Sequence, residues 1–167
     1  RRMIFDVTAT DGPKQEHCFA INDVVISNAL HSKMADLQVS YDGTPTADYR
    51  ADGIIFATPT GTTAYSLSAG GPIVYPSVEA ITMTPISPHS LISRSFVFPP
   101  ESRLTVQSAN SAYTPNLHIS IDGAIKLDTT DPAASVEIKK SSFMAQFIQF
   151  DEVDFYRTLK EKIISNS

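Results

Sequence analysis

The sequence predicts a mainly β protein, a β-sandwich that forms a single domain over residues 1–167. Three observations predict this fold. Apolar and polar residues alternate with a period of two in several segments, Asp-Gly pairs separate apolar runs, and eleven prolines interrupt the chain. Such alternation is typical of strands with one buried face, and Asp-Gly pairs favour tight turns. With 42% apolar residues, the chain is long enough to form one hydrophobic core.

The alternating segments give strands in chain order. They are Leu37–Tyr41, Leu104–Gln107, Leu117–Ile121 and Val136–Ile138. Each places its apolar side chains on one face and its polar side chains on the other. Turns with positive backbone φ are expected at Asp11-Gly12, Asp42-Gly43 and Asp122-Gly123.

Helical periodicity is convincing only near the C-terminus. Residues 152–164 form an amphipathic pattern in which Tyr156, Leu159 and Ile163 share one face and charged residues flank them. The pattern predicts a helix that buries this face, and we expect it to pack on a domain that lies outside this chain. A second, short helix is expected after Thr62.

The stretch Asp52–Pro72, DGIIFATPTGTTAYSLSAGGP, is the most informative part of the chain. An apolar strand, Ile54–Phe56, runs into a Pro/Gly turn and then into five hydroxyl side chains within seven residues. A strand that leads through a turn into a helix leaves backbone N–H groups without partners, beside short donors and acceptors. This arrangement suits a ligand that carries sugar and phosphate groups. Neither a P-loop nor a Gly-x-Gly-x-x-Gly motif is present.

Composition excludes several other classes. Thirteen Lys and Arg against eighteen Asp and Glu give a net charge of −5, and the basic residues are scattered, so nucleic acid is not expected as a partner. No apolar run is long enough to cross a membrane. The four His have no metal-ligand spacing, so no metal site is expected. The single cysteine, Cys18, fits a cytoplasmic protein.

The segment TPTGTTAY resembles the signature of the NAD kinase family, with Thr62 in place of the usual Ser. Four further matches occur in the family's order. They are Asn22-Asp23, Arg50–Gly53, Pro85–Leu91 and Asp122-Gly123. The resemblance implies the all-β C-terminal domain of an NAD kinase, a transferase that makes NADP from NAD with ATP and Mg²⁺. It also implies a homo-oligomer, a dimer or tetramer, whose sites are completed by a neighbouring subunit through Asp52.

Carrying the family's motif onto this chain predicts a set of residues that bind NAD. They are Asn22, Asp23, Lys33, Arg50, Asp52, Thr60, Thr63, Ala64, Tyr65, Ser66, Leu67, Ser68 and Asp122. A carboxylate and an amide side by side suit a ribose diol, and Tyr65 could stack on a ring. Each has a structural alternative, because Asn, Asp and Gly also favour turns and a buried tyrosine needs no ligand. His89 is interpreted as structural or as a support for ligand-binding residues.

The family's Gly-Gly-Asp-Gly motif, whose carboxylate is the expected base, is absent from this sequence. In the family that motif belongs to an N-terminal α/β domain, and the opening RRMIFDV resembles the passage into the second domain. No catalytic residue is therefore expected in this chain, and the N-terminal domain is its expected partner. Two alternatives stay open: a non-catalytic module that binds NAD or NADP, and a lipid kinase of the diacylglycerol or sphingosine kinase group.

Overall fold

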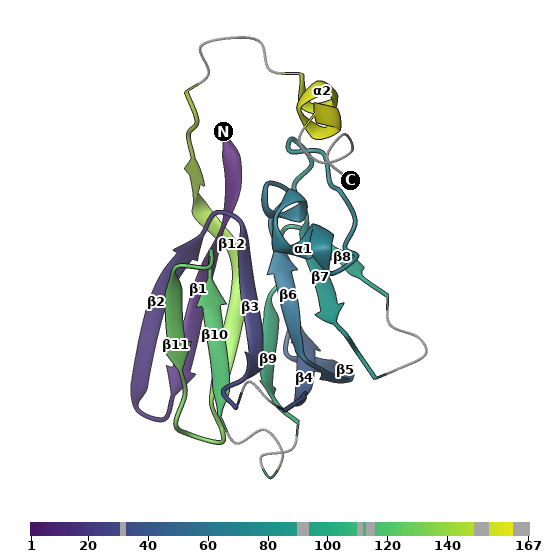
Figure 1. Cartoon of the computed structure of the whole chain (residues 1–167). Coiled ribbons are helices and arrows are strands. Elements are labelled where there is room, and N and C mark those ends of the chain that lie inside the picture. Colours follow the sequence, from purple (N-terminus) through teal and green to yellow (C-terminus); the bar gives the residue numbers. More distant parts are fainter. Residues whose placement is uncertain (31–32, 90–93, 110–111, 113–115, 149–153, 162–167) are drawn as a thin grey trace.

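Two antiparallel sheets pack face to face in the computed structural model (Figure 1). The structure describes residues 1–30, 33–89, 94–109, 112, 116–148 and 154–161. Within them, the first sheet has the strand order β2 (Lys14–Ala20), β1 (Arg2–Asp11), β12 (Ser135–Ala145), β9 (Leu104–Ser108), β4 (Ala35–Tyr41) and β5 (Thr44–Ala51). The second has the order β11 (Ile125–Asp128), β10 (Leu117–Ile121), β3 (Asp23–Asn28), β6 (Gly53–Ala57), β7 (Ile81–Ile86) and β8 (Phe96–Phe98). The predicted β-sandwich is confirmed.

The core lies between the two sheets, as the alternation predicts. In β4, Leu37 and Val39 are buried, and in β10 Leu117, Ile119 and Ile121 are buried. Strand β6 differs because all five of its residues are buried. A strand at the centre of a sheet that is covered on both faces reads as a continuous apolar run. The covering on its outer face comes from α1 (Tyr65–Ser68), which contacts β6.

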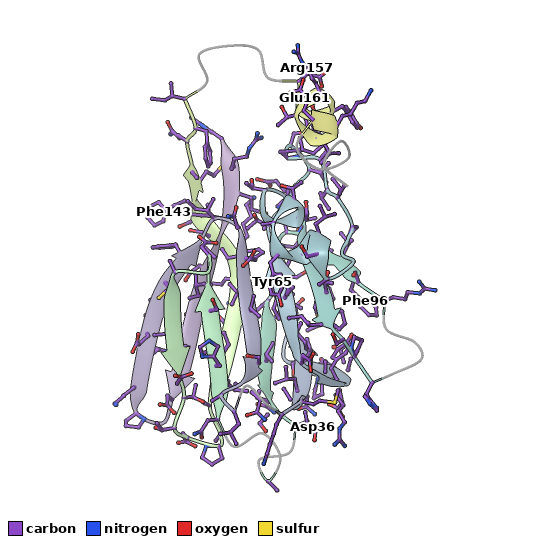
Figure 2. All side chains as sticks on the ribbon, viewed as in Figure 1. Asp36, Tyr65, Phe96, Phe143, Arg157 and Glu161 are labelled. Carbon is purple, nitrogen blue, oxygen red and sulfur yellow. The ribbon has the colours of Figure 1, made fainter. Side chains whose placement is uncertain are left out.

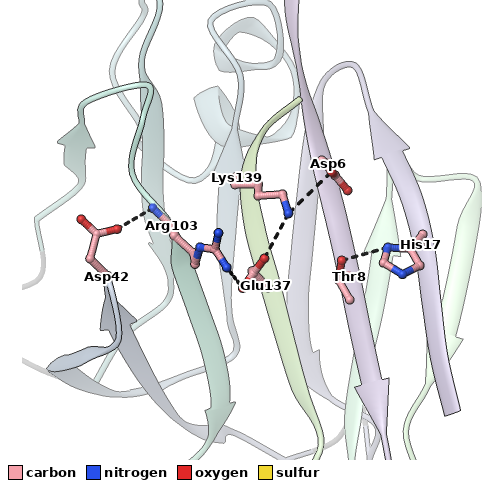
Figure 3. Close-up of polar contacts among 7 residues, drawn as sticks. All are labelled: Asp6, Thr8, His17, Asp42, Arg103, Glu137 and Lys139. Atoms are coloured by element: carbon pink, nitrogen blue, oxygen red, sulfur yellow. Dashed lines mark hydrogen bonds and ion pairs between the residues drawn. The ribbon is translucent and has the colours of Figure 1, made fainter. Parts of the chain in front are cut away.

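The solvent-facing side of the first sheet carries a row of paired charges (Figure 3). Lys139 lies 3.7 Å from a carboxylate oxygen of Asp6 and 3.3 Å from one of Glu137. Glu137 also accepts a hydrogen bond from the Arg103 guanidinium at 3.1 Å. Cross-strand pairs of opposite charge stabilise a sheet. This face is therefore a solvated surface.

The three predicted Asp-Gly turns are present. The backbone φ is positive at Gly12, at both Asp42 and Gly43, and at both Asp122 and Gly123. The predicted short helix also forms, as the 3₁₀ turn η1 (Gly61–Thr63) followed by α1. Both follow the last residue of β6, and the structure thus places the TPTGTTAY segment at one end of the strands of the second sheet (Figure 1).

The C-terminal helix, α2 (Phe155–Leu159), forms inside the predicted range. Residues 152–153 and 162–164 of the predicted range lie outside the described residues. The ring of Tyr156, on the predicted apolar face, lies 6.0 Å from that of Tyr75, although Tyr156 is still 68% exposed. Part of the apolar face is thus covered by this chain itself, and packing of the rest on another domain stays a prediction. No described helix has the length and apolar character needed to cross a membrane.

Candidate functional site

The segment Ile21–Asp23, where β3 begins, is fixed by all six of its backbone polar groups. The carboxylate of Asp122 accepts hydrogen bonds from the backbone N–H groups of Ile21, Asn22 and Asp23, at 2.8, 2.7 and 3.0 Å. On the carbonyl side, the Thr58 hydroxyl donates to the oxygen of Ile21 at 2.6 Å and the Thr58 N–H donates to that of Asn22 at 2.9 Å. The Asp122 N–H donates to the oxygen of Asp23 at 3.0 Å. Only the side chains of this segment are left to bind a ligand.

The TPTGTTAY segment packs directly against this strand entry. A Cβ atom at Gly61 would lie 1.9 Å from the carbonyl oxygen of Asn22, so only glycine allows this approach. The Gly61 N–H donates to the Thr58 hydroxyl at 3.1 Å. Thr62 is fully buried, and its hydroxyl donates to the oxygen of Pro59 at 2.7 Å and accepts from the Val74 N–H at 3.1 Å. Several hydroxyls of this segment thus hold the loop together.

A cavity of about 530 Å³ opens on the outer face of the second sheet, next to this loop. Its lining comes from β3, β10, the Asp122-Gly123 turn and the start of α1. The lining residues are Asn22, Asp23, Val25, Ala64, Tyr65, His118, Ser120, Asp122 and Gly123. Five of the residues predicted from the sequence line it together: Asn22, Asp23, Ala64, Tyr65 and Asp122.

Asp23 has the most strongly shifted pKa of the groups that line this cavity. Its side chain is 6% exposed, and its pKa is raised from 3.8 to about 6. Burial is the largest cause and the nearby charge of Asp122 adds to it, whereas a hydrogen bond from the backbone N–H of Tyr65 acts in the opposite direction. A buried carboxylate keeps few hydrogen bonds to water. A hydrogen bond from a ligand hydroxyl therefore stabilises it more than it would stabilise an exposed carboxylate. Asp23 is therefore poised to accept such a donor.

Other predicted site residues of the loop have different surroundings. Ser66 is fully buried and its hydroxyl lies 3.3 Å from that of Thr84, so it supports the loop and does not face the cavity. Thr63 donates its hydroxyl to the oxygen of Thr60 at 3.2 Å. Thr60 itself has a buried hydroxyl without a hydrogen-bond partner among the described residues. Leu67 is half-buried, and Ser68 is exposed beside it on α1.

The structure does not bring Lys33, Arg50 and Asp52 to this cavity. Asp52 precedes the first residue of β6, whereas the loop follows its last residue. A five-residue strand spans about 15 Å. The guanidinium of Arg50 lies 3.8 Å from Asp36, which Figure 2 shows at the far end of the sheets from α1. Within one chain these residues form a separate group.

His89 also lies at that far end. Its backbone N–H donates to the oxygen of Arg50 at 2.8 Å, so its segment supports the strand that carries Arg50. This contact agrees with the interpretation of His89 as a structural residue. Ser90 and Leu91 of the matched segment lie outside the described residues.

Four lining residues were not among the predicted site residues: Val25, His118, Ser120 and Gly123. A usable signal was present, because His118, Ser120 and Asp122 are spaced two residues apart and must share one face of a strand. The structure places them in a row along β10 and into the turn that follows it. Sequence alone could not show that this row faces a cavity.

The other cavities are less suited to a nucleotide. One of about 360 Å³ is lined by Arg103, Lys139 and Lys140 among others, and it includes none of the site residues predicted from the sequence. A cavity of about 250 Å³ borders the turn at Asp11. The carboxylate of Asp11 already accepts hydrogen bonds from the backbone N–H groups of Thr130 and Asp131. In the described part of the chain, no three His, Cys, Asp or Glu residues are grouped to hold a metal ion.

Comparison with known proteins decides the family. Residues 21–150 match the model of the ATP-NAD kinase C-terminal domain. The chain belongs to the NAD kinase family. It is 43% identical to the NAD kinase of Thermoanaerobacter sp. (strain X514) over 148 residues, which cover 86% of this chain and 50% of that protein. It is 34% identical to the NAD kinase of Clostridium beijerinckii over 168 residues, which cover 99% of this chain and 57% of that protein.

Solved structures support the fold and the family. The chain resembles yeast NADH kinase, solved in complex with NADH, with a TM-score of 0.84 and 30% identity over 99% of this chain and 48% of that one. It also resembles an NAD kinase from Archaeoglobus fulgidus, solved in complex with ATP, with a TM-score of 0.77 and 27% identity over 97% of this chain and 61% of that one. This chain spans about half the length of the curated relatives it matches.

We predict that Asp23→Asn stabilises the protein at pH 8 and has little effect at pH 4. Because the pKa of Asp23 is raised on folding, its contribution to stability is fully present below about pH 3.8 and is lost as the pH rises through about 6. A rise of the pKa from 3.8 to about 6 corresponds to at most about 3 kcal/mol. Thermal unfolding between pH 4 and pH 8 measures this, with Asp48→Asn on the exposed side of β5 as the control. A variant less stable than the unaltered chain at pH 8 would contradict the prediction.

We predict that Gly61→Ala disrupts the site and the fold around it. The added Cβ would overlap the backbone of Asn22, and the cost is expected to be about 3 kcal/mol or more. Gly70→Asn is the matched control, since Gly70 has positive φ but open space around it, and Asn tolerates that conformation. Chemical denaturation of both variants gives the difference. Equal stability of the two variants would show that the close approach is not a constraint.

Proposed function

We propose that this chain forms the dinucleotide-binding part of an NAD kinase, and that the intact protein transfers a phosphate from ATP to the adenosine 2′-hydroxyl of NAD to give NADP. The observation that carries the proposal is the cavity that joins Asn22, Asp23 and Asp122 to Tyr65 of the signature loop. The sequence predicted these residues as one site, and they lie on separate parts of the chain. Their meeting at one cavity supports a shared role.

Each lining group has a role that its chemistry supports. The Asn22 amide and the Asp23 carboxylate can hydrogen-bond the hydroxyl groups of a ribose. Tyr65 is 48% exposed beside them, so its ring is available to stack on a base. Asp122 acts through the backbone that it holds, because its carboxylate oxygens accept the three N–H groups of Ile21–Asp23. It positions Asn22 and Asp23.

The base and the ATP-phosphate loop must come from outside this chain. The sequence holds no Gly-Gly-Asp-Gly motif, and the curated relatives are about twice as long. The same holds for Mg²⁺, because the described residues offer no group of ligands for it. Phosphoryl transfer depends on positioning and electrostatic stabilisation of the transferred group. This chain supplies positioning of the acceptor, and we propose the N-terminal domain of the same protein as its partner.

Because the chain belongs to the NAD kinase family, the lipid kinase alternative is rejected. The remaining alternative is a module that binds NAD or NADP without catalysis, and whether a Gly-Gly-Asp-Gly segment precedes Arg1 in the gene would distinguish it. A cytoplasmic location stays a prediction from the single cysteine.

We further propose a homo-oligomer. Lys33, Arg50 and Asp52 lie at the far end of β6 from the cavity, so within one chain they cannot join its lining. A second copy whose far end abuts the cavity would bring them to the ligand. The contribution of Asp52 to a neighbouring site is what the resemblance implies, and the separation of the two groups supports it.

We predict that the 167-residue chain binds NAD weakly and forms no NADP, whereas the intact protein forms NADP from NAD, ATP and Mg²⁺. Asn22→Ala should weaken NAD binding about two- to tenfold, the worth of one hydrogen bond to a neutral ligand group. Isothermal titration measures binding and an enzymatic assay measures NADP. Asn116→Ala, before β10, is the matched control. Turnover by the isolated chain at an enzyme-like rate would contradict the proposed division of labour.

We predict that the intact protein is a dimer or tetramer by light scattering at micromolar concentration. If Asp52 serves a neighbouring site, mixing Asp52→Ala subunits with Asp23→Ala subunits should restore part of the activity that each variant lacks alone, because some mixed interfaces then carry both intact residues. Subunits with both substitutions on the same chain are the control, since mixing cannot repair them. A strict monomer with full activity would overturn the proposal.

A further inference from the structure

The cavity has two chemically different ends. His118, Ser120 and Asp122 follow one another at every second position and all line it. In the strand register, His118 lies opposite Ser27 and Ser120 lies opposite Val25. The backbone N–H of Asp122 donates to the carbonyl oxygen of Asp23. Four residues of strand span about 13 Å. The pair of carboxylates therefore occupies one end of the row and the imidazole of His118 the other.

Charge divides the cavity in the same way. Asp23 is an acceptor that suits hydroxyl donors, and its charge and that of Asp122 repel an anion by Coulomb's law. Among the described residues that line the cavity, His118 is the one whose side chain can carry a positive charge. A dinucleotide has neutral sugar hydroxyls and an anionic pyrophosphate. Its phosphates are therefore expected away from the carboxylates and near His118.

A neighbouring strand holds the His118 ring in place. Nδ1 of His118 lies 2.6 Å from a carboxylate oxygen of Asp128 on β11, and the His118 side chain is 14% exposed. Since a carboxylate only accepts, Nδ1 carries a proton and donates it to Asp128. The contact restricts rotation of the ring, which reduces the entropy lost when a ligand binds. The Ser120 hydroxyl lies next in the row, between His118 and the carboxylates.

We propose that His118, positioned by Asp128, contacts a phosphate group of the dinucleotide and thereby fixes the direction in which the dinucleotide lies along β10. The sugar hydroxyls then face Asn22 and Asp23, and a phosphate faces His118 and Ser120. The inference rests on the proposed function, because it needs a ligand with both sugars and phosphates. It adds a specificity-determining residue outside the TPTGTTAY segment.

The test compares His118→Gln with His17→Gln in the intact protein. His17 lies on the edge strand β2 of the first sheet, where its Nδ1 is 3.0 Å from the Thr8 hydroxyl (Figure 3). It does not line the cavity. Isothermal titration uses three probes: NAD, adenosine and nicotinamide riboside. We expect His118→Gln to weaken NAD binding about five- to tenfold, because a hydrogen bond to a charged group is lost, and to change binding of both nucleosides less than about twofold. His17→Gln should leave all three affinities unchanged.

Two more variants separate contact from structure. His118→Arg keeps a cation and should retain NAD affinity within about threefold, whereas a purely structural histidine would not be rescued by arginine. Asp128→Asn removes the charge that orients the ring and should weaken NAD binding about two- to threefold, again without affecting the nucleosides. Thermal unfolding of each variant checks that folding is intact.

The outcomes distinguish this inference from the proposed function. If the unaltered protein binds neither NAD nor the nucleosides, the proposed function fails and the inference fails with it. If it binds NAD but His118→Gln binds NAD equally well, or weakens NAD and the nucleosides alike, the inference alone is overturned.

Discussion

The site depends on the way the carboxylate of Asp122 holds three consecutive backbone N–H groups at Ile21–Asp23. Buried backbone groups need partners, and here a side chain from a distant turn supplies them. Because Thr58 binds the carbonyl groups on the other side, the segment is fixed from β10 and from β6 at once. These contacts fix the backbone from which Asn22 and Asp23 line the cavity.

The same chemistry recurs at the other Asp-Gly turns. Asp11 accepts from the backbone N–H groups of Thr130 and Asp131, and Asp42 accepts from that of Arg103. In each case the aspartate lies in or beside the turn and also ties it to a segment far along the chain. The hydrogen bonds lower the pKa of Asp11, whereas burial raises that of Asp23. Aspartates at the ends of these strands therefore divide into those that hold the backbone and one whose carboxylate is left to a ligand.

Much of this molecule could be predicted from its sequence. Alternation is a local signal, so it located β4, β9, β10 and the first part of β12, and the Asp-Gly pairs located three turns. Strand β8 is too short to show alternation. The order of the strands could not be predicted either, because it depends on contacts between distant segments. The motif predicted five lining residues of the cavity, but it also included Ser66. A helix of four residues, α1, is too short to show which of its side chains faces inward.

The residues missed in the cavity show the same limit. His118 and Ser120 stand on the polar face of a strand that was correctly predicted, and their spacing was visible. Their role emerges only when β10 pairs with β3 and the signature loop covers the end of that pair. Likewise, the backbone N–H of Tyr65, whose hydrogen bond to Asp23 opposes the rise in the pKa of that carboxyl, comes from a loop that is far away in the sequence.

Strand β6 acts as a spacer of fixed length. It is buried on both faces and pairs in register with β3 on one side and β7 on the other. Removing one residue would turn every later side chain of the strand to the opposite face. The interval between Asp52 and Thr58 therefore cannot change length without loss of the core, whereas the hairpin turns at the ends of other strands can. Among relatives, insertions and deletions are expected in those turns and not between these two residues.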